Sequence, residues 1–294
     1  MATVSQWVEG ARPRTLPAAV APVLVGTGAA YALHAGSAAY ALIALLVSLA
    51  LQVGVNYAND YSDGIRGTDF DRLGPVRLVG QRLASPRDVK IAAMICFASA
   101  ALFGLALVAL SAAWVMLPIG AAAIAAAWYY TGGRRPYGYS GLGEVFVFVF
   151  FGLVATLGTT YTQALSLSAV SIAGAVGIGA LATAILVANN LRDIPTDLSH
   201  GKRTLAVRLG QRRTRGLYAA LLLVALASVL AVGAIHPSAL VALLSFVLAV
   251  PLLRRVLGGA QGKDLIPALS GTGRLELAYG ALLAIGLMAS PHLG

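Results

Sequence analysis

Two short clusters of asparagine and aspartate carry the residues best suited to chemistry. In each cluster an Asn precedes an Asp by four residues, and a further Asp follows three or four residues later. On a helix, such spacings place side chains on one face. The first cluster is Asn56-Tyr-Ala-Asn59-Asp60-Tyr-Ser-Asp63, and the second is Asn189-Asn190-Leu-Arg192-Asp193-Ile-Pro-Thr-Asp197.

The chemistry that these carboxylates suit is divalent-metal binding. Hard oxygen ligands favour Mg²⁺ or Ca²⁺ over softer metals, and Mg²⁺ is typically held by one or two carboxylates together with substrate phosphates and water. Two facing clusters could hold two ions around one diphosphate and so make it a good leaving group. The alternative is a set of solvated loop acids. The predicted Mg²⁺ ligands are Asp60, Asp63, Asp193 and Asp197, with Asp69 as a further member of the first cluster.

Polar and basic residues near the clusters are predicted to bind substrate. Asn56, Asn59 and Asn189 could orient the carboxylates or contact phosphate, and interhelical hydrogen bonding is their alternative role. Basic side chains could take the remaining phosphate charge, or could instead set membrane topology and contact lipid. The basic candidates are first Lys202 and Arg203, and then Arg72 and Arg77.

Aromatic and N-terminal residues complete the candidate set. Tyr137 and Tyr139, with Tyr130 before them, lie in a Gly-rich stretch. Their rings could flank a cation or bind an aromatic ligand, and an interfacial aromatic belt is the alternative. Arg12 and Arg14 are candidates for binding a substrate carboxylate, with snorkelling of their side chains as the alternative.

The elements that must position these residues are membrane helices. The chain is 59% hydrophobic and 11% charged, against about 25% charged in soluble domains. Apolar runs of about 18 residues or more are long enough to cross a bilayer as helices. We predict an all-α integral membrane bundle of nine transmembrane helices. The apolar segments are 15–34, 38–58, 89–110, 114–131, 145–164, 169–190, 217–235, 239–257 and 275–290.

Charge predicts the topology of this bundle. All 21 Lys and Arg residues fall in the N-terminal segment or in every second connection. The positive-inside rule then puts the N-terminus in the cytoplasm and the C-terminus outside. The net charge of +10 is accounted for by topology, lipid attraction and phosphate binding, so no nucleic-acid partner is expected. We expect one transmembrane domain over 1–294, with an interfacial segment at 1–14 and cytoplasmic motif loops at 59–88 and 191–216.

Acidic residues show the same sidedness, which the positive-inside rule does not require. All eleven Asp and Glu residues fall on the predicted inner face. A divalent-cation transporter is the alternative of another class, but it would place acids near the bilayer midplane. The two clusters are four segments apart, which is consistent with an internal repeat of four-helix units that brings them face to face.

At these residues the sequence resembles the UbiA superfamily of intramembrane prenyltransferases, and within it the naphthoate branch. The resemblance covers nearly the whole chain. The spacing from Asp63 to Asp69 departs from the general motif and is similar to that of the naphthoate branch. The matching stretches are 11–22, 59–69, 74–78, Tyr130-Thr-Gly-Gly-Arg-Arg-Pro-Tyr-Gly-Tyr-Ser-Gly-Leu-Gly-Glu144, the second cluster, and Gly201-Lys-Arg-Thr-Leu205.

The resemblance implies a fold and an activity. It implies nine helices around a cavity open to the cytoplasm and to lipid, in a bacterial cell membrane. The implied reaction is Mg²⁺-dependent transfer of a polyprenyl group from its diphosphate to 1,4-dihydroxy-2-naphthoate, with loss of CO₂, giving demethylmenaquinone. Another aromatic acceptor, such as 4-hydroxybenzoate, is the nearest alternative, because residue chemistry alone does not select the acceptor.

Overall fold

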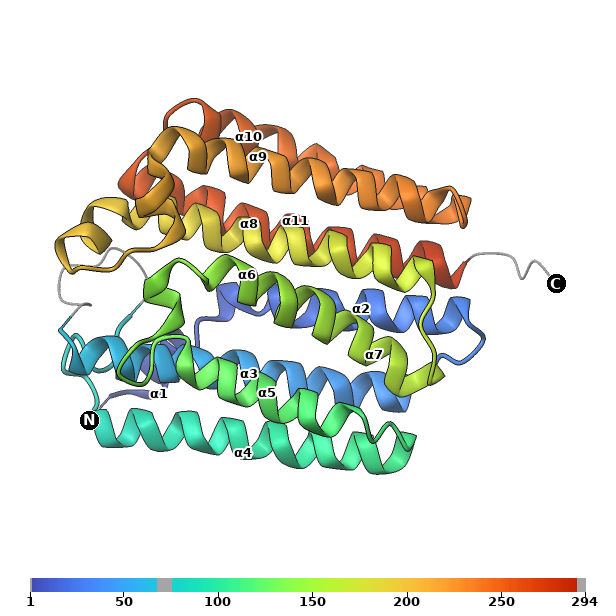
Figure 1. Ribbon diagram of the computed structural model, residues 1–294, viewed down its shortest axis with the longest axis horizontal. Helices are drawn as coiled ribbons and strands as arrows, with labels where there is room; N and C mark the ends of the chain where they lie inside the picture. Colours follow the sequence, from blue (N-terminus) through green and yellow to red (C-terminus); the bar gives the residue numbers. More distant parts are fainter. Residues whose placement is uncertain (1, 68–75, 290–294) are drawn as a thin grey trace.

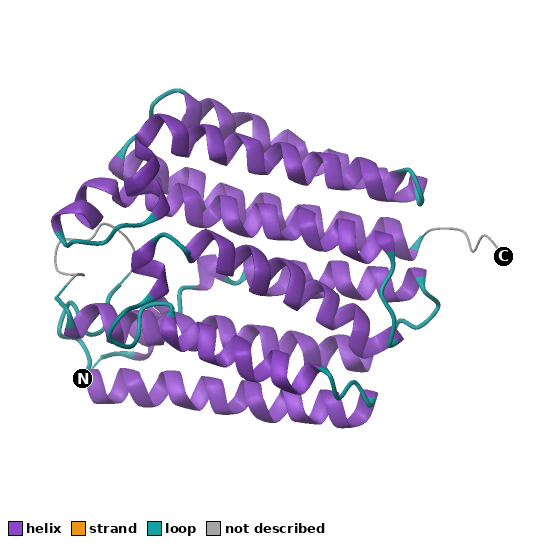
Figure 2. Cartoon of the chain, in the orientation of Figure 1, coloured by secondary structure: helices purple, strands orange, loops and turns teal. Residues whose placement is uncertain are grey.

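The chain forms a bundle of long helices in a computed structural model that describes residues 2–67 and 76–289. Helix is the only regular secondary structure in these residues (Figure 2). The elements are α1 (Val4–Gly10), η1 (Pro13–Thr15), α2 (Pro17–Ala32), α3 (Ala38–Ile65), α4 (Pro86–Ser111), α5 (Met116–Tyr129), η2 (Tyr137–Ser140), α6 (Gly143–Val147), η3 (Phe148–Val154), α7 (Ala155–Ala164), α8 (Ala169–Ser199), α9 (Leu205–Gly233), η4 (Pro237–Leu248), α10 (Ala249–Leu257), η5 (Gly262–Leu265) and α11 (Ile266–Met288).

Membrane-spanning length is reached by six of the described helices, or seven if the pair Val4–Thr15 and Pro17–Ala32, bent by 49°, is one span. Two of the rods change character along their length: α6, η3 and α7 continue one another through a π-helical turn, and η4 leads directly into α10. The rods lie side by side along one direction (Figure 1). The protein is therefore an all-helical, multi-pass membrane protein.

Hydroxyl side chains fix where the long helices begin. Ser37 caps α3, Ser85 caps α4, and Thr204 caps α9, each accepting a hydrogen bond from a backbone amide of the first turn. Ser168 and Ser171 form a reciprocal capping pair at the start of α8. These caps satisfy amides that have no partner inside the helix.

Small residues let the rods approach closely. A Cβ added at Gly28 or Gly280 would meet the backbone of Ala284 or Ala21, so α2 and α11 pack backbone to backbone. Gly152 of η3 meets Gly179 of α8 in the same way. Small residues at helix interfaces are the usual means of tight packing in lipid, where apolar side chains gain little by leaving their surroundings.

The two aspartate clusters lie at the same end of the bundle, where α3 and α8 end (Figure 1). Both helices run beyond the apolar segments predicted from the sequence, α3 to Ile65 and α8 to Ser199. The predicted motif loops 59–88 and 191–216 are accordingly wrong in extent, because 59–65, 191–199 and 205–216 are helical. The clusters therefore sit on rigid helical ends.

The buried side chains form two main cores. The larger core joins α2, α8, α9, η4, α10 and α11, and the second joins α3, α4 and the turn at Leu78 and Val79. Between these groups of helices lie the cavities of the candidate site.

Candidate active site

A polar cavity of about 710 Å³ lies between the ends of α3 and α8. Each helix contributes an Asn and an Asp to its wall: Asn59 and Asp63 from α3, and Asn189 and Asp197 from α8. These are i, i+4 and i, i+8 pairs, so each shares one helical face. The basic residues Arg77, Arg192 and Lys202 line the same space, together with Arg12 and Arg14 from the N-terminal segment.

Asp63 is the centre of a contact between three elements. Lys202 Nζ lies 3.3 Å from Asp63 Oδ2, and the hydroxyl of Tyr139 donates to Asp63 Oδ1 at 2.5 Å. The ammonium group also lies 4.3 Å from the centroid of the Tyr139 ring, and Arg66 approaches that ring at 5.5 Å. The ammonium group of Lys202 therefore pairs with the carboxylate of Asp63, which the sequence predicts to bind a metal.

The second cluster is arranged in a similar way. Arg192 binds both oxygens of Asp193, through Nε at 2.6 Å and Nη2 at 2.7 Å, and Nη2 also donates to Asn189 Oδ1 at 2.9 Å. Asp197 Oδ2 accepts from the Thr204 hydroxyl at 3.4 Å. The arrangement orders Asn189 and Asp197 along the cavity wall.

Asn56 and Asp60, the other Asn-x-x-x-Asp pair of the first cluster, point elsewhere. Asp60 is fully buried, and its carboxylate accepts from the backbone amides of Leu78 at 2.7 Å and Val79 at 3.1 Å. Asn56 donates to the Ala11 carbonyl at 2.9 Å. In the structure this pair holds two segments onto α3, whereas Asn59 and Asp63 face the polar cavity.

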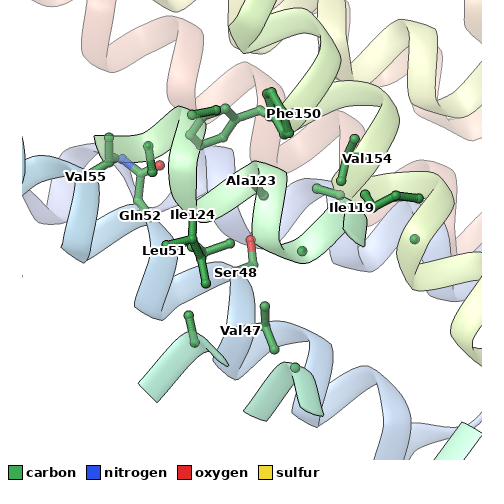
Figure 3. Close-up of a pocket in the computed structure, with 18 of the residues that line it drawn as sticks. Val47, Ser48, Leu51, Gln52, Val55, Ile119, Ala123, Ile124, Phe150 and Val154 are labelled. Carbon is green, nitrogen blue, oxygen red and sulfur yellow. The ribbon is translucent and has the colours of Figure 1, made fainter. Parts of the chain in front are cut away.

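An apolar cavity of about 490 Å³ lies next to the polar one, inside the bundle. Its walls include side chains of α3, α5 and η3 (Figure 3). Six residues border both cavities: Gln52, Asn59, Tyr130, Val147, Phe151 and Leu186. The two spaces therefore adjoin at this set of residues, which we call the junction.

Tyr137 lies against the apolar cavity. Its ring stacks on Phe146 with centroids 3.9 Å apart, and its hydroxyl donates to the Ala126 carbonyl at 2.8 Å. Burial raises the pKa of Tyr137, so the phenol stays neutral and keeps this bond. Tyr137 therefore lines the apolar cavity, and Tyr139 lines the polar one.

The remaining predicted residues divide into two groups. Asp69 and Arg72 lie outside the described residues. Arg203 has an exposed side chain, does not line either cavity, and holds the Tyr139 carbonyl through its backbone amide at 3.0 Å. Asp193 likewise contacts Arg192 and is not among the lining residues.

Sequence reasoning missed two residues of the site. The sequence pattern assigns no role to Arg192, because neighbouring residues of a helix do not face each other, but its long side chain reaches both oxygens of Asp193. Gln52 precedes Asn56 by one helical turn in an apolar run. This i, i+4 spacing indicates that the two polar side chains share one helical face and that Gln52 belongs to the site.

The donor set fits Mg²⁺ as a site completed by its ligand. The described residues contain no group of three or more metal-ligating side chains. Asp63 and Asp197 supply hard oxygens to one cavity from two different helices. One or two carboxylates plus substrate phosphates are what Mg²⁺ usually takes, so these residues fit a metal that binds together with a diphosphate.

The model of the UbiA prenyltransferase family matches residues 19–264. The chain belongs to the UbiA prenyltransferase family. Both clusters and the apolar cavity lie within the matched region, and the polar cavity is also lined by residues from 9–18 and 266–270.

Similar proteins from this family span the whole chain. The 1,4-dihydroxy-2-naphthoate octaprenyltransferase of Mycobacterium tuberculosis is 57% identical over 293 residues and covers 100% of both chains. The enzyme of the same name from Escherichia coli is 38% identical and covers 97% of this chain and 95% of its own.

A solved UbiA homologue from Archaeoglobus fulgidus, bound to DMAPP and Mg²⁺, shares the fold. Its TM-score to this chain is 0.60 at 16% identity, and the match covers 95% of this chain and 99% of that one. At this identity the likeness supports the UbiA fold alone.

Proposed function

We propose that this protein transfers a polyprenyl group from its diphosphate to 1,4-dihydroxy-2-naphthoate, with loss of CO₂ and diphosphate, giving demethylmenaquinol, the hydroquinone form of demethylmenaquinone. The observation that carries the proposal is that a polar, cation-lined cavity adjoins an apolar one. A prenyl diphosphate has a polar end and an apolar tail, so it matches this pair of cavities end for end. The names of the relatives supply the acceptor.

The diphosphate binds in the polar cavity. Lys202 and Arg77 are buried there, with 4% and 5% of their surface exposed, and are its principal cationic contacts. Asp63 and Asp197 hold Mg²⁺ there, and Asn59 and Asn189 orient the carboxylates or contact phosphate. When bound, Mg²⁺ neutralises the diphosphate as a leaving group. Asp69 and Asp193 remain predicted ligands, and Arg72 and Arg203 remain predicted phosphate contacts. The sequence also predicts Asp60 as a ligand, but we propose that its carboxylate instead holds the turn at Leu78 and Val79.

The reaction takes place at the junction. The bond between the prenyl C1 and the diphosphate breaks, a carbon–carbon bond forms to the aromatic ring, and the ring loses its carboxylate as CO₂. Tyr130 is one of the junction residues, and Tyr139 lines the polar cavity. Their rings stabilise positive charge on the allylic group by cation–π attraction.

The same proposal includes the membrane arrangement. We propose one transmembrane domain with nine spans, formed by α2, α3, α4, α5, the α6–α7 rod, α8, α9, the η4–α10 rod and α11. The two ends of the described chain lie at opposite ends of the bundle (Figure 1), which supports an odd number of crossings. With the basic connections inside, the clusters face the cytoplasm of a bacterial cell.

The test is an assay of the full chain in lipid nanodiscs with a polyprenyl diphosphate, 1,4-dihydroxy-2-naphthoate and Mg²⁺. We expect prenylated product and CO₂ in equal amounts. Asp63→Asn and Asp197→Asn should each lose at least about a hundredfold in rate, as expected for loss of a charge-stabilising group. Asp88→Asn, at an exposed acid of the first turn of α4, is the matched control and should keep activity. Product from 4-hydroxybenzoate alone would contradict the acceptor assignment.

A further inference from the structure

Gln52 is a buried amide at the junction of the two cavities. It lies on α3 one turn before Asn56, has 5% of its surface exposed, and borders both the polar and the apolar space. Figure 3 shows it beside Val55 and Leu51 on the wall formed by α3. A polar side chain at this depth in an apolar run is costly unless its groups are paired.

The orientation of the Gln52 amide is fixed by its neighbours. The Thr15 hydroxyl donates to the Arg12 carbonyl at 2.9 Å, so its only proton is used there. The Thr15 oxygen must then accept, and it accepts from Gln52 Nε2 at 2.9 Å and from Asn56 Nδ2 at 3.0 Å. Since the NH₂ group of Gln52 is held by Thr15, its carbonyl oxygen is directed away from Thr15.

That carbonyl oxygen lacks a partner. Gln52 Oε1 is buried and accepts no hydrogen bond from any described residue. A buried acceptor that has lost water and gained nothing is destabilising, and in native proteins such a group usually meets a ligand or an ordered water. The site therefore offers one oriented acceptor to whatever occupies the junction.

The chemistry of the two substrates decides which one can use it. The diphosphate at neutral pH presents acceptor oxygens, and the prenyl tail is hydrocarbon, so neither offers a proton. A dihydroxy aromatic acceptor has hydroxyl groups that donate. We infer that Gln52 Oε1 accepts a hydrogen bond from a ring hydroxyl of the aromatic acceptor and thereby selects and orients the ring; this inference rests on the proposed function.

Selection by such a group is directional. A site built to hydrogen-bond a substrate hydroxyl rejects an analogue that lacks the proton, because the buried acceptor is then left unpaired. The diagnostic ligands are the two monomethyl ethers of the acceptor, in which one hydroxyl can no longer donate. Wild-type protein should use one ether much less well than the parent, by about tenfold to a hundredfold in kcat/KM.

The variant that assigns this preference is Gln52→Met, which keeps length and removes the acceptor. Its kcat/KM for the parent should fall by about tenfold to a hundredfold, with most of the change in KM for the acceptor, while KM for the prenyl diphosphate stays near the wild-type value. In this variant the ratio of kcat/KM for the parent acceptor to kcat/KM for the ether should approach one. Thr15→Val, which frees the amide to turn, should reduce the ratio in the same direction.

Gln163→Met is the matched control. Gln163 Nε2 donates to Thr27 and its Oε1 accepts from the Ser37 amide at 2.8 Å, so this glutamine is paired at both ends and borders neither cavity. This variant should keep the wild-type ratio of parent to ether even if it is less stable.

Two results would overturn the inference. Equal use of the parent and both ethers by the wild type, which needs no variant to fold, would show that no hydroxyl is recognised. An unchanged ratio in Gln52→Met would assign the recognition to another group or to a bound water. Failure of the wild type to prenylate the parent acceptor at all would instead contradict the proposed function.

Discussion

At the scale of single residues, the carboxylates of the site are balanced by cations of the chain itself. Lys202 neutralises Asp63, and Arg192 neutralises Asp193. A buried charge without a partner is strongly destabilising, so these pairs explain how the clusters remain folded at the end of a membrane bundle. Under the proposed function, Asp63 would hold the metal and Lys202 would contact the phosphate, in place of their contact with each other.

Asp60 and Asp63 of the first cluster are expected to respond differently to substitution by Asn, which replaces one carboxylate oxygen with an NH₂ group. Asp63→Asn should weaken Mn²⁺ binding, measured by electron paramagnetic resonance in the presence of a non-reacting diphosphate. Asp60→Asn should leave Mn²⁺ binding near wild type. It should instead lower the free energy of unfolding by about 1–3 kcal/mol, because its NH₂ group would face the amide of Leu78 or Val79.

Thermal unfolding in detergent measures the second effect, and Asp88→Asn serves as the control for both variants. Equal loss of Mn²⁺ binding in Asp60→Asn and Asp63→Asn would mean that Asp60 is a ligand, as the sequence predicts.

At the scale of elements, α3 forms a wall of both cavities. Its face towards the polar cavity carries Asn59 and Asp63, and Asn56 and Asp60 lie on the face about 60° away, since three residues advance a helix by about 300°. Both pairs have the same spacing, so the sequence predicts a helix with two candidate faces. Only the rotation of α3 in the bundle, set by packing against α2 and α4, selects the face that lines the polar cavity.

The glycines of the apolar cavity provide a test of tail binding. Gly120 of α5 lines this cavity, and a Cβ added there would meet nothing within 4 Å. Gly120→Leu should therefore fill the space without a clash, and its better helix propensity should keep or raise stability. We expect kcat/KM for a long prenyl diphosphate to fall by about tenfold relative to that for geranyl diphosphate.

Gly216→Leu is the control for this substitution. Gly216 lies on α9, is exposed, has equally open surroundings and borders neither cavity. A chain-length profile that is the same in both variants and in wild type would contradict the assignment of the apolar cavity to the prenyl tail.

At the scale of the whole molecule, the bundle consists of two packed cores with the cavities between them. Each apolar segment of the sequence overlaps a helical rod, because hydrophobic length is a local property that the sequence displays directly. The π-helical turn at Phe148–Val154 and the continuation of α8 through Pro195 were not predictable in this way. At the π-helical turn, Gly152 packs against Gly179 of α8, a contact between rods that the sequence does not display.

Membrane sidedness can be tested on the whole chain because its single cysteine, Cys96, is readily replaced. In a Cys96→Ala background, Ser166→Cys and Ser199→Cys place thiols at exposed positions near opposite ends of α8. A membrane-impermeant maleimide should label Ser166→Cys in intact cells and Ser199→Cys only after the cells are broken. Labelling of Ser199→Cys in intact cells would reverse the proposed topology.

The position of the apolar cavity inside the helical bundle has a consequence for how the reaction rate depends on the prenyl substrate. If the tail-binding space is inside the membrane bundle, the prenyl substrate is drawn from a two-dimensional solution, and its effective concentration is a mole fraction of the surrounding amphiphile. The concentrations of the aromatic acceptor and Mg²⁺ are expressed per litre of solution, whereas that of the prenyl donor is expressed as a mole fraction of the lipid. Adding detergent or lipid at fixed substrate should therefore slow the enzyme by surface dilution, and rate constants from different preparations become comparable only on that scale.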